Sequence, residues 1–186
     1  MRTGLQIQNS KKMKAMKRIY LLVIVAGLML AGTSCSKDET NGPDVAPVTI
    51  EKENYTFLKN AGLYQEAQKD RSENYSSTFE IDSVTRTGAI MEINVSFPAG
   101  CETNKFEVIW DGTVMESYPP QTRIFVKRTA TGCVNSGETM TEVLTVDLNE
   151  LIFTGNDDQL RDAIIIVSNA SKKPDTQNAD NVSSNS

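Results

Sequence analysis

The strongest constraint on the fold is an alternation of apolar and polar residues between Ala89 and Phe97 (AIMEINVSF). Side chains of a β-strand point to the two faces of its sheet with a period of two, whereas an α-helix repeats every 3.6 residues. One face of this stretch carries Met91, Ile93, Val95 and Phe97, and the other carries Glu92, Asn94 and Ser96. The pattern predicts a strand with one face in a hydrophobic core and the other in solvent.

Five further segments have the composition of strands. They are Phe79–Val84, Lys105–Trp110, Gln121–Arg128, Met140–Leu148 and Asp162–Ser168. Six strands, or as many as eight, at a spacing of about 12 residues are typical of a sandwich or a barrel. We therefore predict an all-β fold, an immunoglobulin-like antiparallel β-sandwich of about seven strands, with a small β-barrel as the alternative.

The segments between these strands allow weaker predictions. Asp111-Gly112 favours a tight hairpin turn after Trp110, because glycine adopts the positive φ that such turns require. Pro119-Pro120 is a candidate for a cis peptide bond. Val48–Glu51 predicts a short strand, and Tyr55–Asp70 fits either one or two helical turns or an irregular lead-in to the domain.

The amino-terminal segment indicates export. Lys11–Arg18 is basic, and Ile19–Ala31 is an uncharged, mainly apolar run of 13 residues. A membrane-spanning helix needs about 20 such residues, whereas a shorter run fits the hydrophobic part of a secretory signal. Gly32-Thr33-Ser34-Cys35 then resembles a bacterial lipobox, in which the cysteine is lipidated and becomes the first residue of the mature protein. Cleavage without lipidation is the alternative.

The residues after Cys35 suggest a destination. Ser36-Lys37-Asp38-Glu39 looks like the signal that sends Bacteroidota lipoproteins to the outer face of the outer membrane, and the alternative is a solvated acidic tether. We therefore predict a lipoprotein signal peptide over 1–34, a lipidated Cys35 with a flexible tether over 35–47, and a β-sandwich domain over 48–170. Residues 171–186 are poor in aliphatic side chains, which predicts a disordered tail.

Charge excludes several functions. Residues 1–34 hold six of the 19 basic residues and no acidic one, so residues 35–186 carry 13 basic and 24 acidic residues, a net charge of −11. Such a domain is a poor partner for nucleic acid, whose phosphates are bound by lysine and arginine.

The chain has no histidine, the commonest general base and zinc ligand. We predict no catalytic residue, no metal and no cofactor.

The two remaining cysteines, Cys101 and Cys133, lie in turn-like sequence. Exported proteins meet an oxidising compartment, where a pair of cysteines usually forms a disulfide. Two free thiols or a metal site are the alternatives, but a structural metal site needs about four ligands. The sequence therefore predicts a Cys101–Cys133 disulfide.

A longer stretch, FPAGCETNKFEVIWDGTVMESYPPQTRIFVKR…GC…TEVLTVDLNEL, resembles a group of small Bacteroidota surface lipoproteins with a two-cysteine β-sandwich domain. The resemblance covers about Ser77 to Asn169 and is carried by Gly100, Cys101, Phe106, Trp110, Pro119, Cys133, Asp147 and Leu148. That group often has a histidine a few residues after the first cysteine, where this chain has Asn104 or Lys105. The resemblance implies fold and location but no activity.

Few residues are candidates for contact with a ligand. Tyr118, Tyr75 and Trp110 could stack on sugar rings, but Trp110 shares a face with Phe106 and Val108, which predicts that it lies in the core. Tyr118, beside two prolines, is the better candidate for exposure, and Tyr75 is kept with it. Asp82-Ser83-Val84 matches the O-glycosylation pattern of Bacteroidota secreted proteins, which makes Ser83 a candidate modification site.

Together these features predict a binding or accessory module, without catalytic activity, that is anchored by lipid in the outer membrane and faces the exterior. Its partner would be a glycan or an envelope protein. A structural cell-envelope protein is the alternative, and a small glycan-active enzyme with paired carboxylates is the third hypothesis. A binding module should present an exposed aromatic or polar concavity at one end, whereas a structural protein should present a long bare edge strand or a flat apolar patch for self-assembly.

Overall fold

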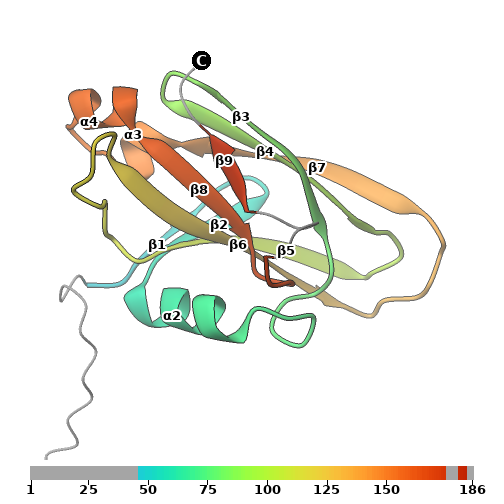
Figure 1. Ribbon diagram of the computed structural model, residues 1–186. Helices are drawn as coiled ribbons and strands as arrows, with labels where there is room; N and C mark the ends of the chain where they lie inside the picture. The colour runs from blue at the N-terminus through green and yellow to red at the C-terminus, as the bar shows by residue number, and fades with distance from the viewer. Residues whose placement is uncertain (1–45, 175–179, 184–186) are drawn as a thin grey trace, which may run out of the picture. The chain divides into compact units, whose positions relative to one another are not determined.

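The computed structural model describes residues 46–174 and 180–183. Two β-sheets pack face to face (Figure 1), one of six strands in the order β1-β2-β5-β6-β8-β9 and one of three strands in the order β3-β4-β7. The sheets do not close into a barrel. The predicted all-β sandwich is confirmed, and the barrel alternative is not.

The larger sheet consists of β1 (Val48–Glu51), β2 (Tyr55–Lys59), β5 (Thr103–Trp110), β6 (Gln121–Thr131), β8 (Ile164–Asn169) and β9 (Asn181–Ser183). The smaller sheet consists of β3 (Glu80–Thr87), β4 (Ile90–Pro98) and β7 (Thr139–Asp147). The helices among the described residues are α2 (Ala61–Asp70), α3 (Leu148–Leu151) and α4 (Asp157–Asp162).

Two strand pairs differ from the expected antiparallel arrangement. The pairs β2–β5 and β6–β8 are parallel, whereas the other neighbouring pairs are antiparallel. Parallel neighbours need a long crossover connection. After β2 the chain forms α2 and then two strands of the smaller sheet, and after β6 it forms β7, α3 and α4. The described residues thus form nine strands instead of about seven.

The main core lies between the two sheets. The alternation in β4 is confirmed, because Met91, Ile93, Val95 and Phe97 are all buried. Phe106 of β5 meets Phe79 and Phe97 edge to face, with ring centroids 5.6 and 5.4 Å apart. Such aromatic pairs each stabilise a fold by about 0.5–1.5 kcal/mol beyond the burial of their area. This aromatic cluster fixes how the smaller sheet sits on β5.

Helix α2 covers the other face of the larger sheet (Figure 1). Ala67 packs there against Ile109, Phe125 and Ala170 in a second core. The helix begins after Asn60, whose side-chain oxygen accepts a hydrogen bond from the amide of Leu63 at 3.0 Å. The ambiguous stretch from Tyr55 to Asp70 is therefore part strand and part helix.

The carboxyl-terminal segment corrects a prediction. Strand β9 pairs antiparallel with Ile165–Val167 of β8, and Asp180 forms ion pairs with Arg71 (2.6 Å) and Arg123. The expected disordered tail from Ser171 is therefore wrong for residues 180–183. The composition of this segment did not predict its order. Its stability comes from distant partners, a sheet edge and two arginines, and not from its own apolar residues.

The connection between β5 and β6 is longer than the sequence predicted. Asp111 accepts a hydrogen bond from the amide of Thr113 at 2.9 Å, and Gly112 has a φ of 90°. These residues form a local turn, but the chain continues through residues 111–120 before β6 begins. Strands β5 and β6 do form an antiparallel hairpin, but the ten residues 111–120 join them, so the predicted tight turn is wrong. The cis bond precedes Pro119 and not Pro120.

The predicted signal peptide, the lipidation site Cys35 and the export signal Ser36–Glu39 lie outside the described residues. Within the part of the chain that is described, no helix is long and apolar enough to span a membrane.

Candidate functional site

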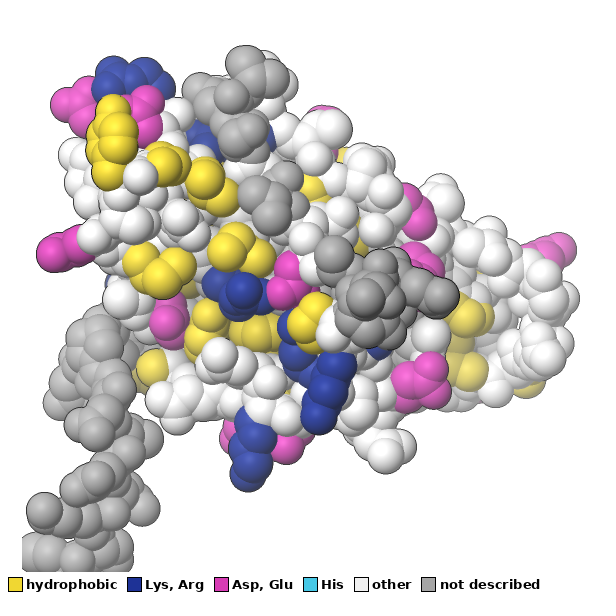
Figure 2. All heavy atoms as spheres, viewed as in Figure 1, with side chains coloured by type: hydrophobic (Ala, Val, Ile, Leu, Met, Phe, Trp, Pro, Cys, Tyr) yellow, Lys and Arg dark blue, Asp and Glu magenta, His cyan; other side chains and the backbone are white. Residues whose placement is uncertain are grey.

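The loop between β5 and β6, residues 111–120, is called here the Tyr118 loop. The side chain of Tyr118 is 96% exposed, and Met115 in the same loop is about half exposed at 49%. A large aromatic side chain left in water gains none of the free energy that its burial would provide. On the face shown in Figure 2, acidic, basic and hydrophobic side chains lie interspersed. An exposed aromatic residue is therefore a more specific feature than the surface charge.

The base of the Tyr118 loop is held by the core. Trp110 is 4% exposed, as predicted from the face it shares with Phe106. Its indole nitrogen donates to the carbonyl oxygen of Thr113 at 3.1 Å and to the hydroxyl of Thr122 at 2.9 Å. That hydroxyl in turn donates to the Thr113 carbonyl at 2.7 Å. A buried hydrogen-bond network of this kind fixes the loop where it leaves the sheet.

The tip of the loop is also hydrogen-bonded. The amide of Met115 donates to the Gln121 carbonyl at 2.7 Å, and the amide of Ser117 donates to the Met115 carbonyl at 2.9 Å. The Ser117 hydroxyl donates to the Pro119 carbonyl at 2.7 Å. Tyr118 is therefore presented by a loop of defined conformation. Pre-organisation of this kind lowers the entropy lost on binding.

A shallow pocket of about 270 Å³ lies elsewhere, between the β1–β2 turn and the first residues of β5. Its polar groups are mostly engaged within the protein. Lys52 pairs with Glu150 at 2.7 Å, Asn54 donates to the Val143 carbonyl at 2.8 Å, and Thr56 donates to Glu51 at 2.8 Å. Ligand pockets usually measure about 300–1,000 Å³. The pocket is a weaker candidate than the Tyr118 loop.

Tyr55 in this pocket is structural. Its hydroxyl donates to the Thr145 carbonyl of β7 at 3.0 Å. Burial, assisted by the negative charges of Glu150 and Asp147, raises the pKa of Tyr55 to about 12. The phenol therefore stays neutral and keeps its proton for this hydrogen bond at all moderate pH values.

Tyr75 does not join Tyr118. It lies between α2 and β3 and packs on the second core, with its hydroxyl 3.4 Å from the Leu63 carbonyl and the Lys127 ammonium 4.8 Å from the ring centroid. Burial, together with nearby carboxylates, raises the pKa of Tyr75 to about 12. Because its ring is committed to this packing, we keep only Tyr118 in the functional hypothesis.

Ser83 lies on an exposed part of β3, beside a register shift between Ile81 and Ser83. Its hydroxyl oxygen accepts a hydrogen bond from the side-chain amide of Asn94 at 3.0 Å. Asp82 accepts a hydrogen bond from the Ser96 hydroxyl at 2.9 Å. The site is reachable from solvent, and its glycosylation stays a prediction.

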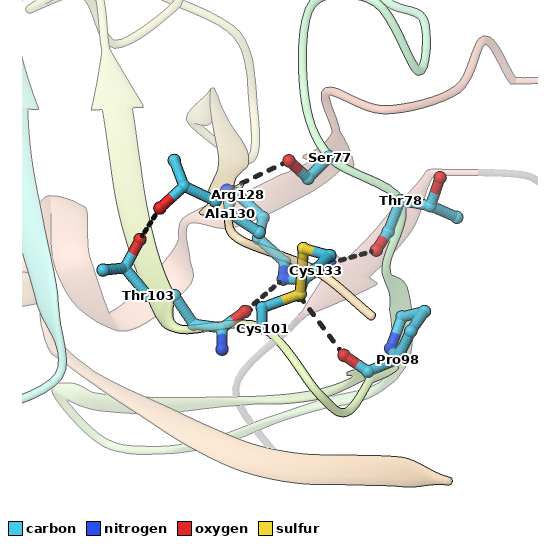
Figure 3. The surroundings of a disulfide bond; sticks show 10 residues. Ser77, Thr78, Pro98, Cys101, Thr103, Arg128, Ala130 and Cys133 are labelled. Atoms are coloured by element: carbon cyan, nitrogen blue, oxygen red, sulfur yellow. Dashed lines mark hydrogen bonds between the residues drawn. A yellow bond between two sulfur atoms is a disulfide. The ribbon is translucent and has the colours of Figure 1, made fainter. Parts of the chain in front are cut away.

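The predicted disulfide between Cys101 and Cys133 is present (Figure 3). It joins the loop after β4 to the loop after β6. Arg128, whose guanidinium lies beside the disulfide, was not among the residues predicted from the sequence. The alternation along β6 could have predicted the burial of Arg128. Ile124, Val126 and Arg128 share one face of the strand, and the face that is buried at the first two residues is also buried at the arginine.

Comparisons with models of known protein families, with curated proteins and with solved structures found no match to this chain. Within residues 46–174 and 180–183, no group of three or more histidine, cysteine or acidic side chains is arranged to hold a metal ion.

Proposed function

We propose that the protein is a binding module, anchored by lipid in the bacterial outer membrane, which contacts a glycan or an envelope protein through the Tyr118 loop. The observation that carries this proposal is the 96% exposed side chain of Tyr118 on a hydrogen-bonded loop. Tyrosine is enriched at binding hot spots because its ring offers a large rigid contact area together with a polar hydroxyl. The module has no catalytic activity of its own.

The anchor in this proposal is the lipid on Cys35. The residues from Ser36 to Pro47 would form the tether to the domain. A dozen residues span at most about 40 Å when fully extended, which gives the domain room to reach a partner beside the membrane. One acyl chain holds a protein only weakly, so the anchor requires the several chains of a bacterial lipoprotein.

The alternative of a structural envelope protein has less support. Such a protein should offer a bare strand edge for assembly. The end strand β7 instead has two of its carbonyl oxygens, those of Val143 and Thr145, occupied by side-chain donors from Asn54 and Tyr55. At one end of the larger sheet the edge strand is β9, which is three residues long, and such short edge strands are poor templates for assembly. These contacts favour a module that binds through a loop.

Site-specific photo-crosslinking in cells tests the contact. The full chain would carry a benzoylphenylalanine at position 118 or, as the control, at position 134. Val134 is 68% exposed and lies in the loop at the other end of β5 and β6. We expect a discrete crosslinked product from position 118 only. Equal products from both positions, or none from position 118, would contradict an envelope-protein partner at this loop.

A glycan array tests the other partner class. We expect bound glycans to be lost with Tyr118→Ala and retained with Val134→Ala. A glycan that binds both variants equally would locate binding elsewhere on the domain. If both the array and the crosslinking are negative, the binding proposal fails.

Protease shaving of intact cells tests the location. We expect the wild-type domain to be released from intact cells, and the Cys35→Ala variant to leave the membrane fraction. A wild-type domain that stays with the membrane but resists the protease would contradict the outward orientation.

A further inference from the structure

A buried cation lies next to the disulfide. Arg128 is 3% exposed and sits on the core side of β6, near the strand's end (Figure 3). Desolvation by burial lowers the pKa of its guanidinium. Arginine nevertheless remains protonated in proteins. The domain therefore holds a buried positive charge beside its disulfide.

Among the described residues, every group that contacts the Arg128 guanidinium is neutral. The guanidinium donates to the side-chain oxygen of Asn104 at 3.0 Å and to the carbonyl oxygens of Thr78 (2.8 Å) and Pro98 (3.4 Å). It also lies 4.7 Å from the ring centroid of Phe97. These partners satisfy its hydrogen bonds but supply no opposite charge. A buried charge without a counter-charge is costly to keep.

The remaining contact of Arg128 is a sulfur atom. One of its nitrogens lies 3.5 Å from Cys101 Sγ. In the disulfide this sulfur is neutral, but a thiolate at the same place would supply the missing counter-charge. A cation beside a cysteine lowers the pKa of the thiol and favours the thiolate.

The two sulfur atoms have different surroundings. Cys133 lies in an exposed loop, whereas Cys101 is half-buried. The carboxylate of Glu102 lies over Gly132, because a Cβ placed on Gly132 would be 2.6 Å from Glu102 Oε2. Within the described residues, Arg128 of β6 is the charged side chain that contacts a sulfur atom of this pair. Its positive charge favours negative charge at Cys101.

We propose that the Cys101–Cys133 disulfide is a thiol-exchange site, in which Cys133 Sγ is attacked and Cys101 Sγ leaves as a thiolate held by Arg128. The co-reactant is a dithiol. Its first thiolate forms a bond to Cys133 Sγ while the protein disulfide breaks, and the electron pair of that bond stays on Cys101 Sγ. The second thiolate of the co-reactant then attacks the co-reactant sulfur that is bound to Cys133 Sγ. A disulfide forms within the co-reactant, and Cys133 Sγ leaves as a thiolate and takes up a proton.

The balance of this sequence is a two-electron transfer. The dithiol is oxidised to a disulfide, and the protein disulfide is reduced to the Cys101 thiolate and the Cys133 thiol. The rate of exchange rises with access to the attacked sulfur and with a lower pKa of the leaving thiol. The structure places the exposed cysteine in the first role and the cysteine beside Arg128 in the second. This activity is independent of binding through the Tyr118 loop.

The equilibrium of reduction is the first test. The full chain with Cys35→Ser leaves Cys101 and Cys133 as its only cysteines. It would be equilibrated in buffers of reduced and oxidised glutathione, trapped by alkylation and weighed by mass spectrometry. We expect Arg128→Gln to lower the equilibrium constant for reduction about tenfold, which corresponds to one pKa unit on the leaving thiol. Arg128→Lys should retain most of the wild-type value.

A matched control separates charge from stability. Arg86 is a second buried arginine, and it donates to the carbonyl of Ala163 beside α4. Arg86→Gln should leave the reduction equilibrium unchanged. An equal effect of Arg86→Gln and Arg128→Gln, or no effect of Arg128→Gln, overturns the proposal.

A second measurement keeps Arg128 in place, in case its variants fold poorly. In the Cys35→Ser, Cys133→Ser chain, the thiolate absorbance near 240 nm reports the pKa of Cys101. We expect a pKa below the ordinary value of about 8.5. A value at or above 8.5 overturns the proposal. In the Cys35→Ser chain, which keeps both cysteines, peptide mapping that finds the glutathione mixed disulfide on Cys101 instead of Cys133 also overturns it.

Discussion

The ion pairs of Asp180 determine how firmly the carboxyl-terminal strand is held. The Asp180 side chain is 14% exposed and lies between Arg71, which is 7% exposed, and Arg123, which is 30% exposed. Removal of one partner from a fully buried pair costs about 3–5 kcal/mol, because a charge is left without compensation. Partial exposure of Arg123 reduces this. We expect Asp180→Asn to lower the free energy of unfolding by about 2–3 kcal/mol.

Urea unfolding of the full chain measures this loss. Trp110 is the chain's single tryptophan and is buried, so its fluorescence reports on the core. With a slope of about 2 kcal/mol per molar urea, the midpoint should fall by about 1–1.5 M. The matched control is Asp158→Asn, since the Asp158 side chain is 92% exposed and pairs with Arg161 on the surface. Surface pairs contribute only about 0–1 kcal/mol.

Acid provides an independent measure of the same contact. Burial acts to raise the pKa of Asp180, but hydrogen bonds and charges from Arg71 and Arg123 outweigh it and lower the pKa below its ordinary value of 3.8. A depressed folded-state pKa contributes stability that is present above the unfolded value and is lost as the pH falls through the folded one. As the pH decreases below about 3.8, the free energy of unfolding of the wild type should therefore decrease more steeply than that of Asp180→Asn. If Asp180→Asn and Asp158→Asn have equal midpoints and equal acid slopes, the reasoning is refuted.

Two further predictions concern the ends of the sandwich. Gly100 has a φ of 88°, and a Cβ there would lie 2.5 Å from the carbonyl oxygen of Val134, so Gly100→Ala should cost about 2–5 kcal/mol in thermal unfolding, from the positive φ and the steric overlap together. Gly137→Ala, where φ is 72° and no atom lies within 4 Å, should cost only about 1–2 kcal/mol, and a larger loss there would contradict the role of the close contact. The raised pKa of Tyr55, about 12, predicts that stability is complete below pH 10 and falls between pH 10 and 12 by up to about 1.4 kcal/mol per pH unit. The urea midpoint of Tyr55→Phe should decrease less steeply with pH over that range than the midpoint of the wild type. Identical slopes for the two proteins would count against a raised pKa at Tyr55.

The features that the sequence predicted are those that follow from short-range patterns. The alternation in β4, the burial of Trp110 and the exposure of Tyr118 each depend on the identity of a few neighbouring residues. The period of a strand decides which side chains share a face, and burial follows from that face. The disulfide was predictable for a related reason, because the chain offers only two cysteines after the export segment.

The features that the sequence did not predict depend on distant partners. The parallel pairing of β2 with β5 requires the chain to visit the smaller sheet and return. Strand β9 is three residues long and exists because β8 offers a free edge. Asp180 is held by arginines that lie 109 and 57 residues earlier in the chain. No local pattern contains such contacts, and propensity is routinely overridden by them.

The two functional proposals occupy opposite ends of one strand, which makes them separable. Strand β6 begins beside the Tyr118 loop at Gln121 and ends beside Cys133 at Thr131. Its 11 residues span about 35 Å at about 3.3 Å per residue. Substitutions more than about 10 Å apart that share no partner usually act independently. Tyr118→Ala should therefore leave the reduction equilibrium unchanged, and Arg128→Lys should leave crosslinking from position 118 unchanged. A cross-effect in either direction would mean that β6 couples ligand contact to the state of the disulfide.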